Sequence, residues 1–249
     1  LIAGAGATGG AFGTYLLEAG RDVTFLLRQA RAAKVREEGL RFTAPDADRT
    51  NKVEVITAEE LCAAPQTFDL VIVAVKANGL DSVIDDIAPA VGEQTLIIPF
   101  LNGMAQIEKL ESRYPGQVLG GFVKIVGTIR DGAVVQLTNM AVMTIGDLQG
   151  ADVPTPISAV LGVPGFKLQT VAGIIDGLWE KWTFIAAAGV VTCLFRAPGG
   201  AIMEAGGRSH VHTIVDELEA VAAAARRPVS GGSHALTLEM LTAGGAAFT

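Results

Sequence analysis

The start of the chain constrains the fold more than any other feature. A short apolar run, residues 1–3, leads directly into a G-x-G-x-x-G turn, and residues 9–19 then have helical spacing up to Gly20. In a strand–turn–helix unit, such glycines allow a tight turn, a close approach of the backbone to a pyrophosphate, and close packing of helix on strand. The helix N-terminus points its N–H groups at the phosphates. The sequence therefore predicts a dinucleotide site at Gly4, Ala5, Gly6, Ala7, Thr8 and Gly9; a glycine-rich turn without a ligand is the competing interpretation.

Short apolar runs alternate with helical stretches along the first 150 residues. Five runs predict strands: residues 1–3, 23–27, 53–56, 70–75 and 95–99. This alternation favours a Rossmann-type, doubly wound parallel sheet. Three more runs, with an Asp131-Gly132 turn signal, predict an antiparallel extension of that sheet: residues 118–129, 134–137 and 142–145. We also expect a helix over 156–161 and a last strand over 167–170.

The pattern becomes helical after about Gly173. Residues 177–195 form a long apolar stretch, residues 211–225 have amphipathic helical spacing, and a third helix is expected from Leu236. The predicted fold class is thus α/β, with a Rossmann-type domain over 1–172 and an all-α domain over 173–249 for substrate binding and dimerisation. Because the chain opens without Met and stops abruptly, we expect residues to be lacking at both ends, and the second domain to be truncated.

Composition limits the classes of partner. A formal net charge of −7 disfavours nucleic acid and anionic lipid. The longest uncharged run, 182–195, is shorter than the roughly 20 residues of a membrane span, which favours a buried core helix.

Cys62 and Cys193 lie in apolar surroundings and are expected to be buried free thiols in a reducing compartment. His210 and His212 are two apart, on different sides of a helix, so no metal site is expected.

Polar residues follow three of the predicted strands. Arg28 comes after the second strand, where a carboxylate would bind the ribose of NAD; a guanidinium there can bind the 2′-phosphate of NADP instead. A solvated surface arginine is the competing interpretation. Lys76 and Asn102 follow two further strands, at the edge where open α/β sheets bind ligands. Two alternative interpretations remain open. Lys76 is then only the charged residue at which a strand reaches the surface, and Asn102 is then only a turn residue before Gly103.

Lys181 heads the most apolar segment, in Leu178-Trp179-Glu180-Lys181-Trp182. Desolvation there would lower the pKa of the lysine, which suits a general acid near neutral pH. Reduction of a ketone needs such an acid, because the carbonyl oxygen gains negative charge as hydride arrives. The alternative is a lysine that extends to solvent from the end of a buried helix.

These features together resemble the ketopantoate reductase family, across essentially the whole chain. The matching features are the glycine run, Arg28, Val75-Lys76-Ala77, Asn102-Gly103-Met104, Asp131-Gly132 and Leu178-Trp179-Glu180-Lys181. The resemblance implies a cytoplasmic homodimer that reduces 2-dehydropantoate with NADPH in pantothenate biosynthesis. It also implies that Thr128 contacts the cofactor, that Lys76 and Asn102 lie between cofactor and substrate, and that Lys181 binds substrate and donates the proton.

The substrate half departs from the family pattern. Ile185, Gly189 and Gly199 stand where the family has asparagines, and the family's late serine and glutamate fall beyond Thr249. Loss of buried amides removes hydrogen bonds to a hydroxyl-bearing acid, so we expect a 2-oxo acid less polar than ketopantoate. Two alternatives stay open: a β-hydroxyacid-type dehydrogenase, whose usual glycine-rich substrate loop is missing, and a non-catalytic NADPH-binding regulatory protein, against which Lys181 argues.

Overall fold

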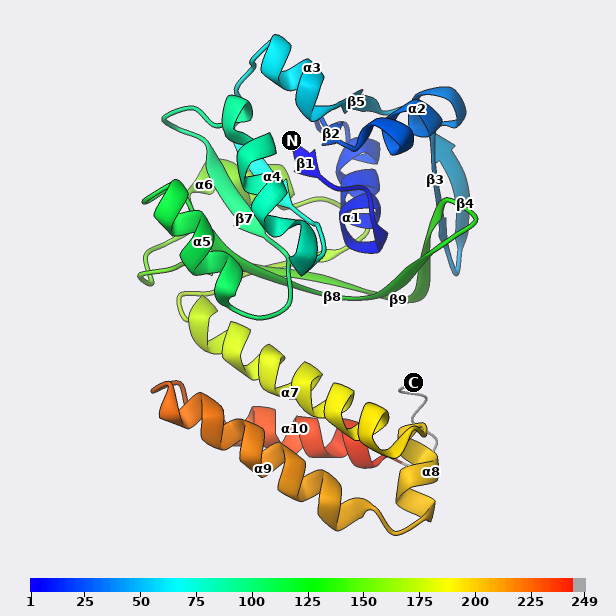
Figure 1. The fold of residues 1–249 in the computed structure, drawn as a ribbon, viewed down its shortest axis with the longest axis vertical. Coiled ribbons are helices and arrows are strands. Elements are labelled where there is room, and N and C mark those ends of the chain that lie inside the picture. The colour runs from blue at the N-terminus through cyan, green and yellow to red at the C-terminus, as the bar shows by residue number, and fades with distance from the viewer. Residues whose placement is uncertain (244–249) are drawn as a thin grey trace. The chain divides into compact units, whose positions relative to one another are not determined.

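The computed structural model describes residues 1–243 and consists of two compact units, residues 1–174 and a second unit that begins at Ile175 (Figure 1). The strands of the first unit are β1 (Ile2–Ala3), β2 (Thr24–Leu26), β3 (Leu40–Ala44), β4 (Ala47–Asn51), β5 (Glu54–Ile56), β6 (Leu70–Val73), β7 (Leu96–Pro99), β8 (Leu119–Arg130), β9 (Ala133–Asp147) and β10 (Lys167–Thr170). Its helices are α1 (Ala7–Glu18), α2 (Gln29–Glu38), α3 (Ala58–Ala63), α4 (Leu80–Asp86), α5 (Ala105–Arg113) and α6 (Thr155–Leu161), with 3-10 helices η1 (Ala77–Gly79) and η2 (Ala88–Ala90).

The central sheet is parallel, in the order β5-β2-β1-β6-β7. Its strands bury alternate side chains in two separate cores. One core holds Ile2, Phe25 and Ile72 together with Phe12 of α1. The other holds Ala3, Leu26 and Val73 together with Leu61, Ile84 and Leu110 of α3, α4 and α5. Coverage of both faces explains why the strands are apolar without alternation, and the Rossmann-type fold class is confirmed.

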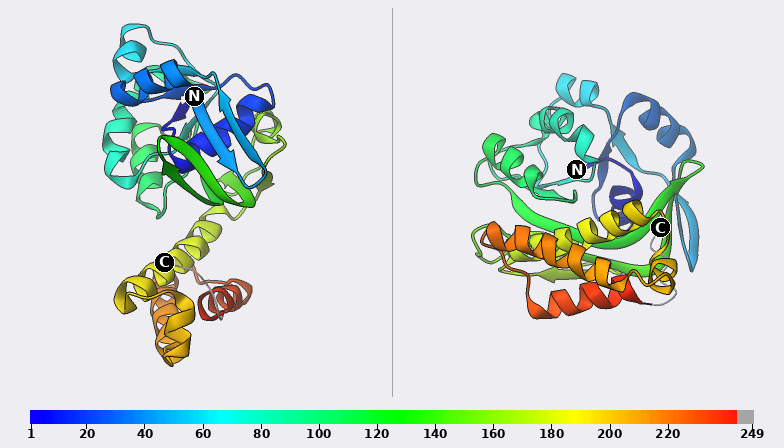
Figure 2. Two further views of the ribbon diagram at one scale, coloured as in Figure 1. Left: turned by 90° about the vertical axis from the view of Figure 1, so that its right-hand side faces the viewer. Right: turned by 60° about the horizontal axis from the view of Figure 1, so that its bottom comes forward.

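The predicted antiparallel extension is a sheet of its own. Its strand order is β10-β9-β3-β4, with β8 paired to β9, and one bridge between Ile97 and Val118 links it to the parallel sheet. β9 is one continuous strand where two were expected, because β8 pairs along it from Leu119 opposite Asp147 to Arg130 opposite Ala133. The ribbon turns at Asp131-Gly132, both at positive φ, as the tight-turn signal predicted. Figure 2 shows this long twisted ribbon in green.

The β3–β4 hairpin was not anticipated from the sequence. β4 reads Ala-Asp-Arg-Thr-Asn and is exposed for most of its length, so it lacks the apolar alternation that identifies a half-buried strand. Its register comes from pairing with β3, where Phe42 is fully buried opposite Arg49. Arg41 and Asp48 add a bidentate ion pair on the exposed side, with N–O distances of 3.0 and 2.7 Å.

The second unit is helical. Its elements are α7 (Ile174–Phe195), α8 (Gly199–Glu204), α9 (Arg208–Ala224) and α10 (Gly231–Thr242). Their apolar faces meet in one core, made of Ala187, Val191, Ile202, Val211, Val215 and Leu241. The helical spacing of 211–225 therefore marks a core-facing stripe only in its first part, from Val211 to Leu218, because Val221 and Ala225 are exposed.

Helix α7 corrects an expectation about length. The uncharged run 182–195 was too short for a membrane span, but the helix continues through Lys181, Glu180 and Asp176 to a total of 22 residues. Among the described residues it is the one helix long and apolar enough to cross a membrane by length and composition, and 22% of that stretch is buried in the structure. Core helices of water-soluble proteins meet the same two criteria, so length does not decide between these roles.

The cysteines are free thiols, as expected, but the prediction that both are buried is wrong. Cys62 and Cys193 are both exposed. Each lies near a fully or almost fully buried residue of its own helix, Leu61 in α3 and Val191 in α7. A step of one residue rotates a side chain by about 100° around a helix, and two residues by about 200°. An apolar neighbourhood in sequence therefore did not imply burial.

Candidate active site

The glycine turn follows β1, and at two of its positions the backbone leaves room only for glycine. Gly4 has φ +102°, and a Cβ atom there would lie 2.9 Å from the carbonyl oxygen of Ala74. At Gly9, a Cβ would overlap the Gly4 carbonyl oxygen and lie 2.9 Å from the Ala74 Cβ. The first glycine thus makes the turn and the third packs α1 onto the sheet, as predicted from the spacing.

The middle glycine faces open space. A Cβ built at Gly6 has no heavy atom within 4 Å. Gly6 is also the N-cap of α1, with φ −77° and ψ −167°, and it has no side chain to accept from the first-turn N–H groups. These N–H groups have no partner within the helix. The turn therefore fits a phosphate group, which would occupy the open side of Gly6 and accept from the helix N-terminus.

The other candidate residues of this unit come shortly after the ends of strands that lie side by side in the sheet. Leu26, Ala3, Val73 and Pro99 are neighbours in register on β2, β1, β6 and β7. The strands are parallel, so the segments after these four residues leave the sheet at the same edge. The glycine turn follows Ala3, and the residues that follow the other three strands are Arg28, Lys76 and Asn102. Residues separated by up to 98 positions in sequence are thus placed at one carboxyl edge.

Arg28 is the exposed N-cap residue of α2. Its Nη2 atom lies 3.7 Å from the position of a Cβ at Gly79, so the guanidinium reaches the segment after β6. The nearby Arg31 donates to the Gly132 carbonyl oxygen at 2.8 Å, and Arg36 donates to Glu60. Within the described residues no hydrogen bond or ion pair engages the Arg28 guanidinium, which leaves its donors available for an anion. Gly79 was missed in the sequence, because nothing there linked it to Arg28.

Lys76 and Asn102 both lie at exposed positions after their strands. Lys76 is the N-cap of η1, in extended conformation, and Asn102 precedes Gly103, whose φ is +92°. Asn102 therefore directly precedes a residue in the left-handed conformation, as the turn interpretation expected, and its role toward a ligand stays a prediction.

Thr128 lies on β8, opposite Val135 of β9. The preceding residue, Gly127, faces the start of α1: a Cβ there would lie 3.6 Å from the Ala7 Cβ. The ribbon thus passes beside the glycine turn and brings Thr128 into the same region, although the two segments are about 120 residues apart.

Tyr15 fixes α1 against the ribbon. Its hydroxyl donates to Gln136 Oε1 at 2.9 Å in a buried contact, and its ring packs edge-on against Phe42 at 5.3 Å between centroids. Burial is the largest effect on the hydroxyl and raises the pKa of Tyr15 above its ordinary value. This contact orients the helix whose N-terminus follows the glycine turn.

Lys181 lies on α7, in the second unit. Ile185 and Gly189 follow it at intervals of four, so the three share one stripe of the helix. The core-facing stripe, which includes Phe184, Ala188 and Val191, is about 100° away around the helix. A Cβ at Gly189 would meet no heavy atom within 4 Å. Gly199 begins α8 after the N-cap Pro198 and is buried.

A cavity of about 1060 Å³ opens in the first unit at the opposite edge of the parallel sheet. It is lined by residues at the amino ends of the strands, among them Thr24, Leu70 and Leu96. Open α/β sheets bind ligands at the carboxyl ends, so this cavity is not the dinucleotide site.

Comparison with known proteins identifies the family. The family model described as ketopantoate reductase PanE/ApbA matches residues 1–150. The chain belongs to the ketopantoate reductase family. "Uncharacterized oxidoreductase YkpB" of Bacillus subtilis is 34% identical over 223 residues, 88% of this chain and 72% of that protein. As a member of this family the chain is an oxidoreductase of the ketopantoate reductase type.

Two further relatives define the range of the match. The 2-dehydropantoate 2-reductase of Lactococcus lactis is 34% identical over 44% of this chain, and this match spans only 35% of its own length. The crystal structure of 2-dehydropantoate 2-reductase from Geobacter metallireducens is 26% identical, with a TM-score of 0.86 over 98% of this chain and 83% of that one. The fold is thus shared along the chain, whereas close sequence identity to that Lactococcus enzyme covers less than half of it.

Proposed function

We propose that this chain is an NADPH-dependent reductase of a 2-oxo acid. The observation that carries the proposal is the alignment of the glycine turn, Arg28, Lys76 and Asn102 at one edge of the parallel sheet. The curated relatives named 2-dehydropantoate 2-reductase support this reaction type. Lys181 is proposed as the general acid from its sequence context and from the family resemblance.

The residues of the first unit would bind and orient the cofactor. Gly4 and Gly9 shape the turn, and the first-turn N–H groups of α1 would donate hydrogen bonds to the pyrophosphate beside Gly6. Arg28 would bind the 2′-phosphate through charge-assisted hydrogen bonds. When bound, the dinucleotide supplies the hydride. Thr128 would contact the cofactor from the ribbon.

The remaining residues would act on the substrate. Lys76 and Asn102 would orient the 2-oxo acid beside the nicotinamide, and a lysine cation there offsets the charge of the carboxylate. As the carbonyl carbon receives hydride, its oxygen becomes an alkoxide, and the Lys181 ammonium would donate the proton that gives the 2-hydroxy acid. Lys181 would then recover a proton from solvent.

Ile185 and Gly189 bear on the choice of substrate. An isoleucine and a glycine cannot hydrogen-bond a substrate hydroxyl, whereas an amide at these positions could. Sites built to hydrogen-bond a hydroxyl reject analogues without one strongly, and apolar sites discriminate weakly. We therefore propose that the substrate is a 2-oxo acid less polar than ketopantoate.

The test is NADPH oxidation by the full chain with ketopantoate and with a series of apolar 2-oxo acids. The proposal expects turnover, with higher kcat/KM for the apolar acids. Preference for ketopantoate would overturn the substrate assignment alone. Tight NADPH binding without turnover of any 2-oxo acid would favour a non-catalytic regulatory protein. A homodimer in the cytoplasm is part of the same proposal, and light scattering of the purified chain tests the dimer.

A further inference from the structure

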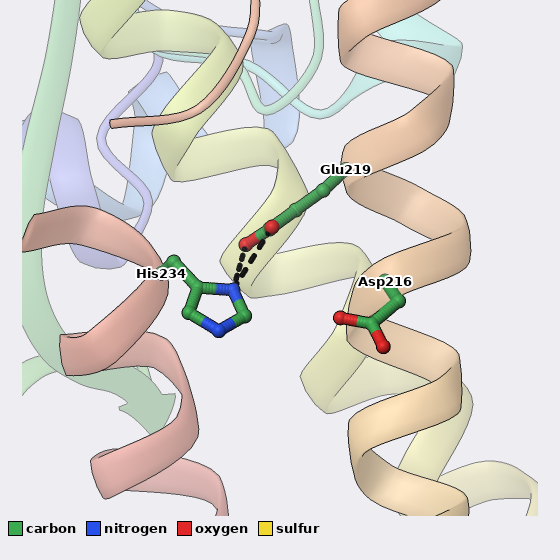
Figure 3. A group of neighbouring side chains, drawn as sticks. All are labelled: Asp216, Glu219 and His234. Atoms are coloured by element: carbon green, nitrogen blue, oxygen red, sulfur yellow. Dashed lines mark hydrogen bonds and ion pairs between the residues drawn. The ribbon is translucent and has the colours of Figure 1, made fainter. Parts of the chain in front are cut away.

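Three potential metal ligands converge in the second unit. Asp216 and Glu219 lie on α9 and His234 lies on α10 (Figure 3). One ligand atom from each lies within 4.8 Å of the other two. The Nδ1 atom of His234 is 3.0 and 2.9 Å from the two carboxylate oxygens of Glu219. We propose that these three side chains bind a divalent transition metal ion of the Zn²⁺ type, which ties α10 to α9.

The two carboxylates share one face of α9 because they are three residues apart. Figure 3 shows both side chains directed from α9 toward the imidazole on α10. This set was not predicted from the sequence, because His234 is 15 positions from Glu219 and on another helix. The paired His210 and His212, which drew attention in the sequence, are not part of it; the His210 ring packs edge-on against Phe195.

The helices that carry the ligands are fixed by contacts independent of the cluster. α9 and α10 pack together in the apolar core through Val211, Val215 and Leu241. α10 begins at a capped end, where Ser230 Oγ accepts from the Ser233 N–H at 3.2 Å. The backbone N–H of Ser230 donates to Glu180 Oε1 of α7 at 3.1 Å. Ligands on rigid helices hold their geometry better than ligands on loops.

The spacing suits a tetrahedral ion. Two ligands about 2.0–2.1 Å from Zn²⁺ at the tetrahedral angle lie about 3.3–3.4 Å apart. The His234–Glu219 pair needs to open by only a few tenths of an ångström, and the exposed Asp216 can approach by a side-chain rotation. Without metal, the imidazole donates its Nδ1 proton to Glu219; with metal on Nδ1, the imidazole carries its proton on Nε2. Water would be the fourth ligand.

The ligand set also sets the class of ion. Imidazole nitrogen suits Zn²⁺, Cu²⁺ or Ni²⁺, whereas Mg²⁺ and Ca²⁺ prefer oxygen alone. Two carboxylates and one neutral imidazole balance the double positive charge of the ion. The ion would contact both helices at once, so its expected effect is greater stability of the helical unit by binding only the folded state.

The first experiment measures Zn²⁺ binding to the chelator-treated full chain by calorimetry. We expect one ion per chain. His234→Ala should weaken binding by roughly 100-fold or more, because even residues that only support a ligand contribute 10–100-fold. The matched control is His212→Ala, which removes a histidine of α9 that is outside the cluster and should leave binding unchanged. Absence of stoichiometric binding, or equal loss in both variants, would overturn the proposal.

A second variant keeps the proposal testable if His234→Ala fails to fold. Asp216→Asn changes an exposed side chain and keeps its shape, so the fold should survive while the affinity falls; Glu217→Gln is the matched control. Substitution of Co²⁺ gives a visible spectrum that reports tetrahedral coordination, and its loss in Asp216→Asn but not in Glu217→Gln is expected. An unchanged Co²⁺ spectrum in both His234→Ala and Asp216→Asn would place the ion elsewhere.

Discussion

Gly9 lies against the carbonyl oxygen of Gly4, and a methyl group at Gly9 would overlap that oxygen. Gly6, between them in sequence, faces no atom within 4 Å. The same motif therefore contains one glycine required by the protein's own packing and another whose open side suits a ligand. This difference separates the effects of two otherwise similar substitutions.

Gly9→Ala should lower the free energy of unfolding by about 1–3 kcal/mol, since the added carbon has to displace backbone. Gly6→Ala should leave the stability nearly unchanged and yet weaken NADPH binding, because its methyl group would occupy the space proposed for a phosphate. Chemical denaturation and fluorescence titration with NADPH measure the two effects. Unaltered NADPH affinity in Gly6→Ala would argue against a phosphate at this turn.

Arg28→Ala should weaken NADPH binding by roughly 10–100-fold, the equivalent of the 1.5–3 kcal/mol of a charged hydrogen bond. NADH lacks the 2′-phosphate, so its affinity should change little. Lys34→Ala, which removes another cation from α2, is the control and should affect neither. Binding titrations with both dinucleotides measure this. Equal weakening of NADPH and NADH in Arg28→Ala would remove its role in selection.

Lys181→Ala should reduce kcat by ~10²-fold or more without loss of NADPH affinity, as expected for removal of a general acid. Lys167→Ala, an exposed lysine on β10, is the matched control. Steady-state rates with the best 2-oxo acid measure the loss of turnover, and NADPH titration shows whether cofactor binding is retained. A wild-type rate in Lys181→Ala would exclude this lysine as the proton donor.

Ile185→Asn should shift specificity toward ketopantoate. An amide at this position can hydrogen-bond the substrate hydroxyl, and a gain of about 1.4 kcal/mol corresponds to a tenfold rise in relative kcat/KM. The comparison is the ratio of kcat/KM for ketopantoate to that for an apolar acid, in wild type and variant. An unchanged ratio would mean that Ile185 does not contact the part of the substrate that differs.

The two tyrosines should titrate above pH 10. Burial raises the pKa of both Tyr15 and Tyr114 above the ordinary value of 10.0. Each group therefore contributes stability that is fully present below pH 10 and is lost as the pH rises through the folded-state pKa. The chain has only these two tyrosines, so tyrosinate absorbance reports them directly. Native protein that titrates with the same midpoint as denatured protein would contradict this.

The sequence alone determined the elements that depend on residues close together in the chain. The glycine run predicted β1 and α1 because turn geometry and close packing restrict those positions to glycine. Unbroken apolar runs predicted β6 and β7, and helical spacing predicted α9. The Asp131-Gly132 turn was predicted because few residues accept positive φ. These features give the Rossmann-type fold class and the dinucleotide turn without coordinates.

The tertiary structure decided what depends on residues far apart in the chain. Only strand order and register place Arg28, Lys76 and Asn102 at one edge with the glycine turn, and only pairing in space reveals the exposed β4 and the single long β9. The exposure of Cys62 and Cys193 depends on which side of each helix faces a core. The meeting of Asp216, Glu219 and His234 depends on how α10 packs on α9. A sequence pattern records the preferences of neighbouring residues, whereas these contacts arise from long-range packing.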